Sequence, residues 1–182
     1  WNTTAGGRRG PGSISVLDTR TRTVRATWPI PGGGSPDMGG LSADGKELWL
    51  SGRYDDEVYA IDTTTGAVTT LAGSGTAGYT DGQGAAATFT APRYLAFDNN
   101  GDIIVSEENV NKHRLVTLTG AVTTLPLFTG LTTINRLSPV LQLKNGGYLG
   151  MINTPTVTYS NATGSSMPRR ENSIFVRSGS SA

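Results

Sequence analysis

Short apolar stretches separated by polar turns recur along the whole chain. Segments 58–62, Val-Tyr-Ala-Ile-Asp, and 103–106, Ile-Ile-Val-Ser, have the length and the branched or aromatic residues typical of β-strands. Turns that contain glycine follow such segments, for example at 43–46 and 99–102. No window of about eleven residues or more places apolar side chains at helical spacing. The pattern predicts an all-β chain.

The sequence repeats itself at intervals that match one small sheet. Residues 14–24 align with 58–68, an offset of 44, and Gly-Ala-Val-Thr-Thr-Leu at 66–71 recurs at 120–125, an offset of 54. Units of this length with four strands each are typical of β-propeller blades. We therefore predict a β-propeller segment of about three four-stranded blades within a single unit, residues 1–182.

The turns divide this segment into successive groups of strands. We predict a half-blade at 13–30, blades at 36–72 and 91–126, and a partial blade at 136–178. The first group contains only the latter half of a blade and the last group lacks its fourth strand, so the two ends are expected to be complementary half-blades. Because a closed propeller needs roughly four to eight blades, we expect the chain to complete a ring with further blades or with a second copy.

Composition restricts the partners without identifying one. There are 15 lysines and arginines against 14 acids, and the resulting net charge of +1 predicts neither a nucleic-acid partner nor binding to an anionic membrane surface. No apolar run approaches the roughly 18 residues that a membrane span needs. The absence of cysteine excludes disulfides and thiolate metal sites. Trp1 stands where an initiating methionine is expected, which indicates a processed or truncated chain.

Two parts of the chain resemble known propeller repeats. Residues 12–68, which include Ser-Ala-Asp-Gly-Lys-Glu-Leu-Trp-Leu-Ser at 42–51, resemble the YVTN-type repeat of bacterial and archaeal surface proteins. Residues 68–125 are similar to an NHL repeat, on the basis of Ala-Pro-Arg-Tyr-Leu-Ala-Phe-Asp at 91–98 and the His-Arg pair at 113–114. Both resemblances imply four-stranded propeller blades.

The last part, residues 135–178, looks weakly like a sialidase-type blade, in which an arginine shortly precedes a proline. In that family an arginine cluster holds a substrate carboxylate through bidentate hydrogen bonds, so the resemblance would give this role to Arg136. No complete Asp-box follows. A glycosidase also needs an acid and a nucleophile at a defined separation, and the sequence does not fix Glu107, Glu108 or Glu171 in such roles.

Candidate binding residues occur where first strands begin and where second strands connect to third strands. In a propeller these loops gather on one face around the central channel. In the aligned units, first strands begin near Asp37, Arg93 and Arg136. We predict a ligand-binding rim that could receive a carboxylate or a sugar, formed by Asp37, Arg53, Arg93, Glu107 and Arg136. The alternative is a solvated rim held by local hydrogen bonds.

We predict no catalytic residue, no metal and no cofactor. His113 is the only histidine, so a zinc site or a Ser-His-Asp triad could be assembled only through it, and a packing role is expected instead. The turn at 98–102 has oxygen side chains like those of a calcium loop, but it lacks the downstream glutamate, and a hairpin turn explains it better.

These observations predict a non-enzymatic binding or scaffolding module for a protein or a small carbohydrate. We expect a secreted, periplasmic or cell-surface location, which the glycosylation sequon at 161–163 supports only weakly. One alternative is a propeller enzyme: a sialidase-like hydrolase, or a lyase or lactonase, whose channel metal would need converging ligands. Another is an engineered or chimeric propeller without a natural ligand.

Overall fold

The computed structural model describes residues 12–108, 112–126, 136–153, 157–160, 166–169 and 173–177, with only the backbone for 136–139 and from 150 onward. Helical turns within these residues are limited to two short 3-10 turns, Pro31–Gly33 and Gly84–Ala86. None of the described helices is long and apolar enough to cross a membrane. The rest of the regular structure is β-strand.

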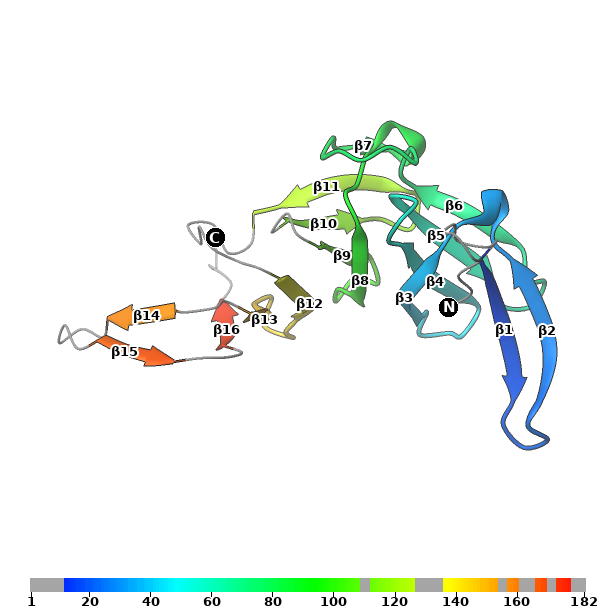
Figure 1. Cartoon of the computed structure of the whole chain (residues 1–182), viewed down its shortest axis with the longest axis horizontal. Coiled ribbons are helices and arrows are strands. Elements are labelled where there is room, and N and C mark those ends of the chain that lie inside the picture. Colours follow the sequence, from blue (N-terminus) through cyan, green and yellow to red (C-terminus); the bar gives the residue numbers. More distant parts are fainter. Residues whose placement is uncertain are drawn as a thin grey trace, which may run out of the picture.

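The strands form antiparallel sheets that follow one another along the chain (Figure 1). The half-blade contains β1 (Ser13–Asp18) and β2 (Thr23–Pro29). Blade 1 contains β3 (Pro36–Leu41), β4 (Glu47–Gly52), β5 (Glu57–Asp62) and β6 (Val68–Ala72). Blade 2 contains β8 (Pro92–Phe97), β9 (Ile103–Glu107), β10 (Lys112–Val116) and β11 (Ala121–Leu125). The partial blade contains β12 (Arg136–Gln142), β13 (Tyr148–Asn153) and β16 (Ser173–Arg177).

The predicted fold class is confirmed: the chain is all-β, with four-stranded sheets like propeller blades and incomplete sheets at both ends. Two elements were not predicted. The short strand β7 (Gly82–Gln83) pairs with β11 as a fifth strand of blade 2, and β14 (Val157–Ser160) forms a separate hairpin with β15 (Ser166–Arg169). Both additions belong to connections and leave the four-strand order of blades 1 and 2 unchanged.

Strand β5 shows how a blade is buried on both faces. Successive side chains of a strand point to opposite faces of its sheet. Val58 is fully buried in a cluster shared with blade 2, whereas Tyr59 and Ile61 are buried in a cluster with residues of the half-blade. A strand that is buried on both faces has a nearly continuous apolar sequence, which explains why apolar and polar residues do not alternate in β5.

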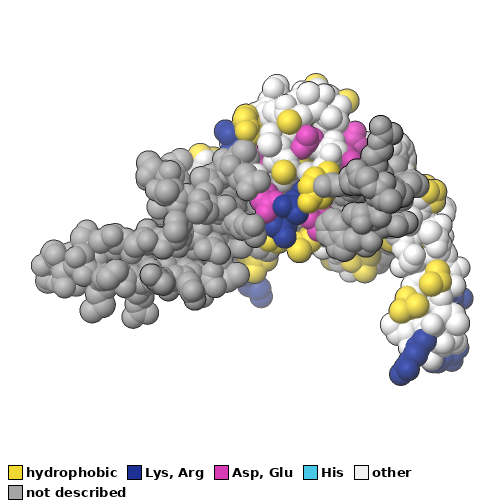
Figure 2. Space-filling view, in the orientation of Figure 1, with side chains coloured by type: hydrophobic (Ala, Val, Ile, Leu, Met, Phe, Trp, Pro, Cys, Tyr) yellow, Lys and Arg dark blue, Asp and Glu magenta, His cyan; other side chains and the backbone are white. Residues whose placement is uncertain are grey.

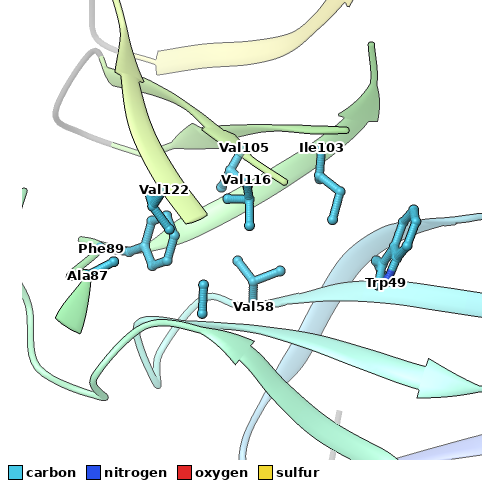
Figure 3. Close-up of a cluster of buried hydrophobic side chains, with 9 residues drawn as sticks. Trp49, Val58, Ala87, Phe89, Ile103, Val105, Val116 and Val122 are labelled. Carbon is cyan, nitrogen blue, oxygen red and sulfur yellow. The ribbon is translucent and has the colours of Figure 1, made fainter. Parts of the chain in front are cut away.

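Blades 1 and 2 share one hydrophobic core, and its side chains point toward one another between the two ribbons (Figure 3). Trp49 also meets Phe97 of the neighbouring blade, with ring centroids 5.0 Å apart. The core is formed by Trp49, Val58 and Ala72 of blade 1, by Ala87 and Phe89 of the connection, and by Ile103, Val105, Val116 and Val122 of blade 2. The connection between the blades therefore contributes to the core itself.

Replacing Phe89 with alanine tests this shared core. Because Phe89 is fully buried between the two blades, we expect Phe89→Ala to lower the free energy of unfolding by about 3 to 5 kcal/mol. Leu118, which is more than half exposed in a turn, provides the control. Leu118→Ala should change the free energy of unfolding by less than about 0.5 kcal/mol. Denaturant titration followed by circular dichroism measures both, and equal effects would contradict a core shared through Phe89.

Candidate functional site

The first strands of blade 1, blade 2 and the partial blade each carry a β-bulge near their start. The pairing register shifts at 36–39 in β3, at 92–94 in β8 and at 137–140 in β12, and in each case the first strand has one residue more than the second strand opposite. A bulge bends the strand and changes the direction of its side chains. Asp37 and Arg93 lie within the bulges of blades 1 and 2.

Four charged side chains meet across the boundary between these two blades. Arg93 Nε lies 3.9 Å from Asp37 Oδ2. Arg53 and Glu108 directly follow β4 and β9, so they occupy equivalent positions in the two blades. Arg53 Nη2 donates to Glu108 Oε2, and Arg93 Nη1 donates to Glu108 Oε1 at 2.5 Å. We name Asp37, Arg53, Arg93 and Glu108 the charge quartet.

The charge quartet is electrically compensated within itself. Its two guanidinium groups balance its two carboxylates, so its formal charge is zero. The side chain of Glu108 is only 2% exposed and that of Asp37 8%, whereas those of Arg53 and Arg93 are 20% and 19% exposed. Buried charges are tolerated when they are paired in this way. The accessible part of the quartet is therefore formed mainly by the two arginines.

Ser51 connects the bulges of the two blades. Its hydroxyl accepts a hydrogen bond from the Met38 N–H at 3.2 Å and donates to the carbonyl oxygen of Arg93 at 2.7 Å. Both contacts are to backbone groups of bulge segments, one in each blade. One buried hydroxyl thus fixes the spacing of the segments that carry Asp37 and Arg93.

Ala91 provides a second connection next to the charge quartet. Its N–H donates to Asp56 Oδ1 at 2.7 Å, and its carbonyl oxygen accepts from the Glu108 N–H at 2.9 Å. Ala91 has a φ of 49°, in the left-handed region that residues other than glycine seldom adopt. These contacts hold the backbone of Glu108 against the loop of blade 1 that contains Arg53.

A tyrosine follows each arginine of the charge quartet. The guanidinium carbon of Arg53 lies 4.9 Å from the Tyr54 ring centroid, and that of Arg93 lies 5.0 Å from the Tyr94 ring centroid. Tyr54 is 45% exposed, so its ring offers a flat apolar surface beside the charges. Figure 2 shows basic and acidic side chains side by side near the centre of the view.

The structure brings three of the five predicted binding residues together: Asp37, Arg53 and Arg93. Glu107 is level with Gly52 of blade 1 and points away from the quartet. The side chain of Arg136 lies outside the described residues. Glu108 was not among the predicted rim residues, although aligning the two blades places opposite charges at 53 and 108, a signal that could have identified it.

The strand register also changes the expected equivalence of Arg136. Asp37 and Arg93 each stand eight residues before the positive-φ glycine of the following hairpin turn. In the partial blade this position is Ser138, and Arg136 lies two residues earlier. The pairing of β12 with β13 agrees, because it contains the same bulge at 137–140.

Glu107 belongs to a second polar cluster, in which Glu107 and Arg114 are buried in blade 2 and Asp81 is an exposed residue of the connection. Arg114 is fully buried, and its Nη1 donates to Glu107 Oε1 at 3.2 Å while its Nη2 donates to Asp81 Oδ1 at 2.6 Å. The same guanidinium donates to the backbone carbonyl oxygens of Thr80 and Thr88. Arg114 therefore ties the connection between the blades to blade 2, and the cluster has a structural role.

The two carboxylates of this cluster have shifted acidities. Burial raises the pKa of Glu107 to about 7, although hydrogen bonds from the Thr90 N–H and from Arg114 act in the opposite direction. Partial burial would also raise the pKa of Asp81, but hydrogen bonds from Thr124 and Arg114 outweigh it, and the pKa of Asp81 is lowered. Glu107 is therefore only partly ionised at pH 7 whereas Asp81 is ionised, and both carboxyl groups accept hydrogen bonds from Arg114.

His113 is buried in the same blade. It is 1% exposed, and its Nδ1 lies 3.0 Å from the Ser106 hydroxyl oxygen. Burial lowers the pKa of His113 to about 4, so the ring is neutral at pH 7. Within the described part of the chain, no three His, Asp or Glu side chains are grouped so that they could hold a metal ion.

Comparison with known proteins gives one local match in sequence. No protein-family model matches the chain. A stretch of 81 residues, 44% of the chain, is 33% identical to protein SUPPRESSOR OF QUENCHING 1, chloroplastic, of Arabidopsis thaliana, and covers 8% of that protein. This match is too short to assign the chain to a family.

Solved structures support the fold. Virginiamycin B lyase from Staphylococcus aureus is 16% identical, with a TM-score of 0.58 over 93% of this chain and 54% of that chain. An auxiliary nutrient binding protein from Bacteroides thetaiotaomicron is 16% identical, with a TM-score of 0.60 over 78% of this chain and 40% of that chain. Hydrazine synthase from Kuenenia stuttgartiensis is 14% identical, with a TM-score of 0.60 over 90% and 43%. At these identities the likeness shows a propeller-like fold alone, and the chain spans about half the length of these structures or less.

The buried histidine predicts a pH dependence of stability. The folded state lowers the pKa of His113 from 6.5 to about 4, so the unfolded chain takes up the proton first as the pH falls. Relative to His113→Asn, the unsubstituted protein should keep a constant stability above pH 6.5 and lose up to about 3 kcal/mol between pH 6.5 and 4. Urea titrations at a series of pH values measure this difference. A difference that stayed constant down to pH 4 would contradict the burial of a neutral ring.

Proposed function

We propose that this chain is a non-enzymatic binding module whose ligand contacts the charge quartet and Tyr54. The observation that supports the proposal most directly is that Asp37 and Arg53 of blade 1 meet Arg93 and Glu108 of blade 2 at one place. Pockets at junctions between repeated sheets commonly combine a few convergent polar groups with an apolar surface. The partly exposed arginines supply the polar groups here, and Tyr54 supplies the apolar surface.

A small carbohydrate is the ligand that this surface suits best. One face of a sugar ring is apolar and can stack on an exposed aromatic ring, while its hydroxyl groups accept from guanidinium N–H groups. Tyr54 and Arg53 offer both contacts next to each other, because the guanidinium of Arg53 lies over the Tyr54 ring. A peptide with polar side chains is the alternative ligand of the same chemistry.

The names of similar structures support nutrient binding. Besides the protein from Bacteroides thetaiotaomicron, a similar structure from Bacteroides ovatus is also described as an auxiliary nutrient binding protein, at 21% identity and a TM-score of 0.55. We extend nutrient binding to this chain as part of the proposal, together with the predicted location outside the cytoplasm.

A lyase is the second candidate, because three of the similar structures are of virginiamycin B or streptogramin B lyases. Such an enzyme would need an acid or base at the ligand face. The only histidine of the chain, His113, is buried inside blade 2 beside Ser106 and is only 1% exposed. We therefore favour binding over catalysis.

We also propose that further blades or a second copy cover the half-blade. Leu17 and Val24 are cross-strand partners in β1 and β2, and both are more than half exposed. Among the described strands β1 pairs only with β2, so it has a free edge that can pair with another strand. Such a contact would bury the apolar pair and complete the sheet.

Two tyrosine variants test the binding proposal. Tyr54 and Tyr79 are similarly exposed, at 45% and 47%, and each has a basic side chain over its ring, but Tyr79 lies in the connection between the blades. For any monosaccharide that binds, we expect Tyr54→Ala to raise the dissociation constant about tenfold, since stacking of the sugar on the ring is lost. Tyr79→Ala should leave it unchanged.

Calorimetric titration with a panel of neutral and acidic monosaccharides measures these constants. NMR titration of the same samples locates the ligand, and we expect the amide signals of 52–56 and 107–108 to shift. Binding that is equally affected by both tyrosine variants, or no binding by any sugar of the panel, would contradict the proposal.

A further inference from the structure

Glu108 of blade 2 occupies the position that Arg53 occupies in blade 1. Arg53 and Glu108 each come directly after the second strand of their blade, one residue beyond the pairing of that strand with the first strand. The blades are otherwise built alike: both have the bulge and a hairpin turn with a positive-φ glycine, and the turn of blade 1 is one residue longer. The sheet therefore accepts either a positive or a negative side chain at this position.

Glu108 also occupies the place that a carboxylate ligand would take. Two guanidinium groups that converge on one point form a typical binding site for a carboxylate, which accepts hydrogen bonds through both oxygens. Here Arg53 binds Oε2 and Arg93 binds Oε1 of the same glutamate. Because the Glu108 side chain is 2% exposed, it fills the site from inside the protein.

Asp37 adds a second negative charge that would oppose an anionic ligand. Its side chain is 8% exposed, and its Oδ2 lies 3.9 Å from Arg93 Nε without a hydrogen bond. An incoming carboxylate would have to displace Glu108, leave that buried group unpaired, and approach Asp37 as well. Removing the partner of a buried charge is strongly unfavourable.

The equivalent positions of the partial blade add no charge. Its register places Ser138 level with Asp37 and Arg93, and Asn153 level with Arg53 and Glu108. Serine and asparagine are neutral residues, so the six equivalent positions of the three sheets carry a net charge of zero.

We infer that Glu108 sets the charge selectivity of this face, so that it admits neutral hydroxyl-rich ligands and excludes carboxylates. This inference rests on the proposed binding function and specifies its ligand class. Without the charge of Glu108, the two arginines would face Asp37 alone, and the three remaining charges of the quartet would sum to +1. One side chain thus decides between a site for neutral sugars and a site for sugar acids.

The test compares glucose and glucuronate, which differ in one carboxylate, as probes of the full chain. We expect Glu108→Gln to raise the affinity for glucuronate relative to glucose by about tenfold, because glutamine keeps the size of the side chain and removes its charge. Glu47→Gln is the matched control: Glu47 is an exposed acid at the start of β4, whereas Arg53 follows the end of that strand, and the ratio should not change. In the double variant Arg93→Gln/Glu108→Gln, the charges of Arg53 and Asp37 balance again. The gain in affinity for glucuronate should therefore disappear.

The outcomes separate this inference from the proposed function. Circular dichroism first establishes that each variant is folded. If folded Glu108→Gln binds glucuronate no better than the unsubstituted protein, or if the unsubstituted protein already binds glucuronate as tightly as glucose, the inference on Glu108 is wrong. If Glu108→Gln gains glucuronate binding while the unsubstituted protein binds neither sugar, the inference on charge is supported and the proposed carbohydrate-binding function fails.

Discussion

Burial of both faces of each sheet against its neighbours is the constraint on which the rest of this structure depends. A sheet of four short strands has two apolar faces and cannot cover them by itself. Blade 1 places Val58 against blade 2 and Ile61 against the half-blade, so one strand serves two cores. The connection between the blades adds Phe89 to the same core, which makes the packing of blade on blade part of the fold of each.

This packing determines where the polar loops lie. Since the two blades have the same strand order and the same bulge, equivalent residues reach the shared boundary at the same level. Asp37 then faces Arg93, and Arg53 faces Glu108, so that opposite charges meet without any change in the backbone plan. Buried ion pairs of this kind contribute little net stability, because desolvation offsets their attraction. The ion pairs of the charge quartet instead determine which charged groups remain accessible at this surface.

Much of the fold and part of the candidate site could be predicted from the sequence. Glycine turns and apolar segments were enough to predict the strands of blades 1 and 2, because each turn glycine has a positive φ that other residues seldom adopt. The sequence could not show which of Glu107 and Glu108 lies at the charge quartet. Neighbouring residues at the end of a strand point to opposite sides of the sheet. Arg136 was aligned with Asp37 and Arg93 as the residue where a first strand begins, whereas the register is set by the hairpin turn and the bulge. The strand β7 and the hairpin of β14 and β15 lack a repeated pattern, so periodicity could not predict them.

In our proposal, the loop end of the blades that carries the charge quartet is the surface that contacts the ligand. Amide hydrogen exchange, measured with and without a saturating neutral sugar, is the sharpest test of this surface because it reports on every loop at once. We expect slower exchange at 52–56 and 107–108 and no change at the hairpin turns 42–47 and 98–102, which lie at the other ends of β4 and β9. Slower exchange confined to those hairpin turns, with none at the charge quartet, would contradict it.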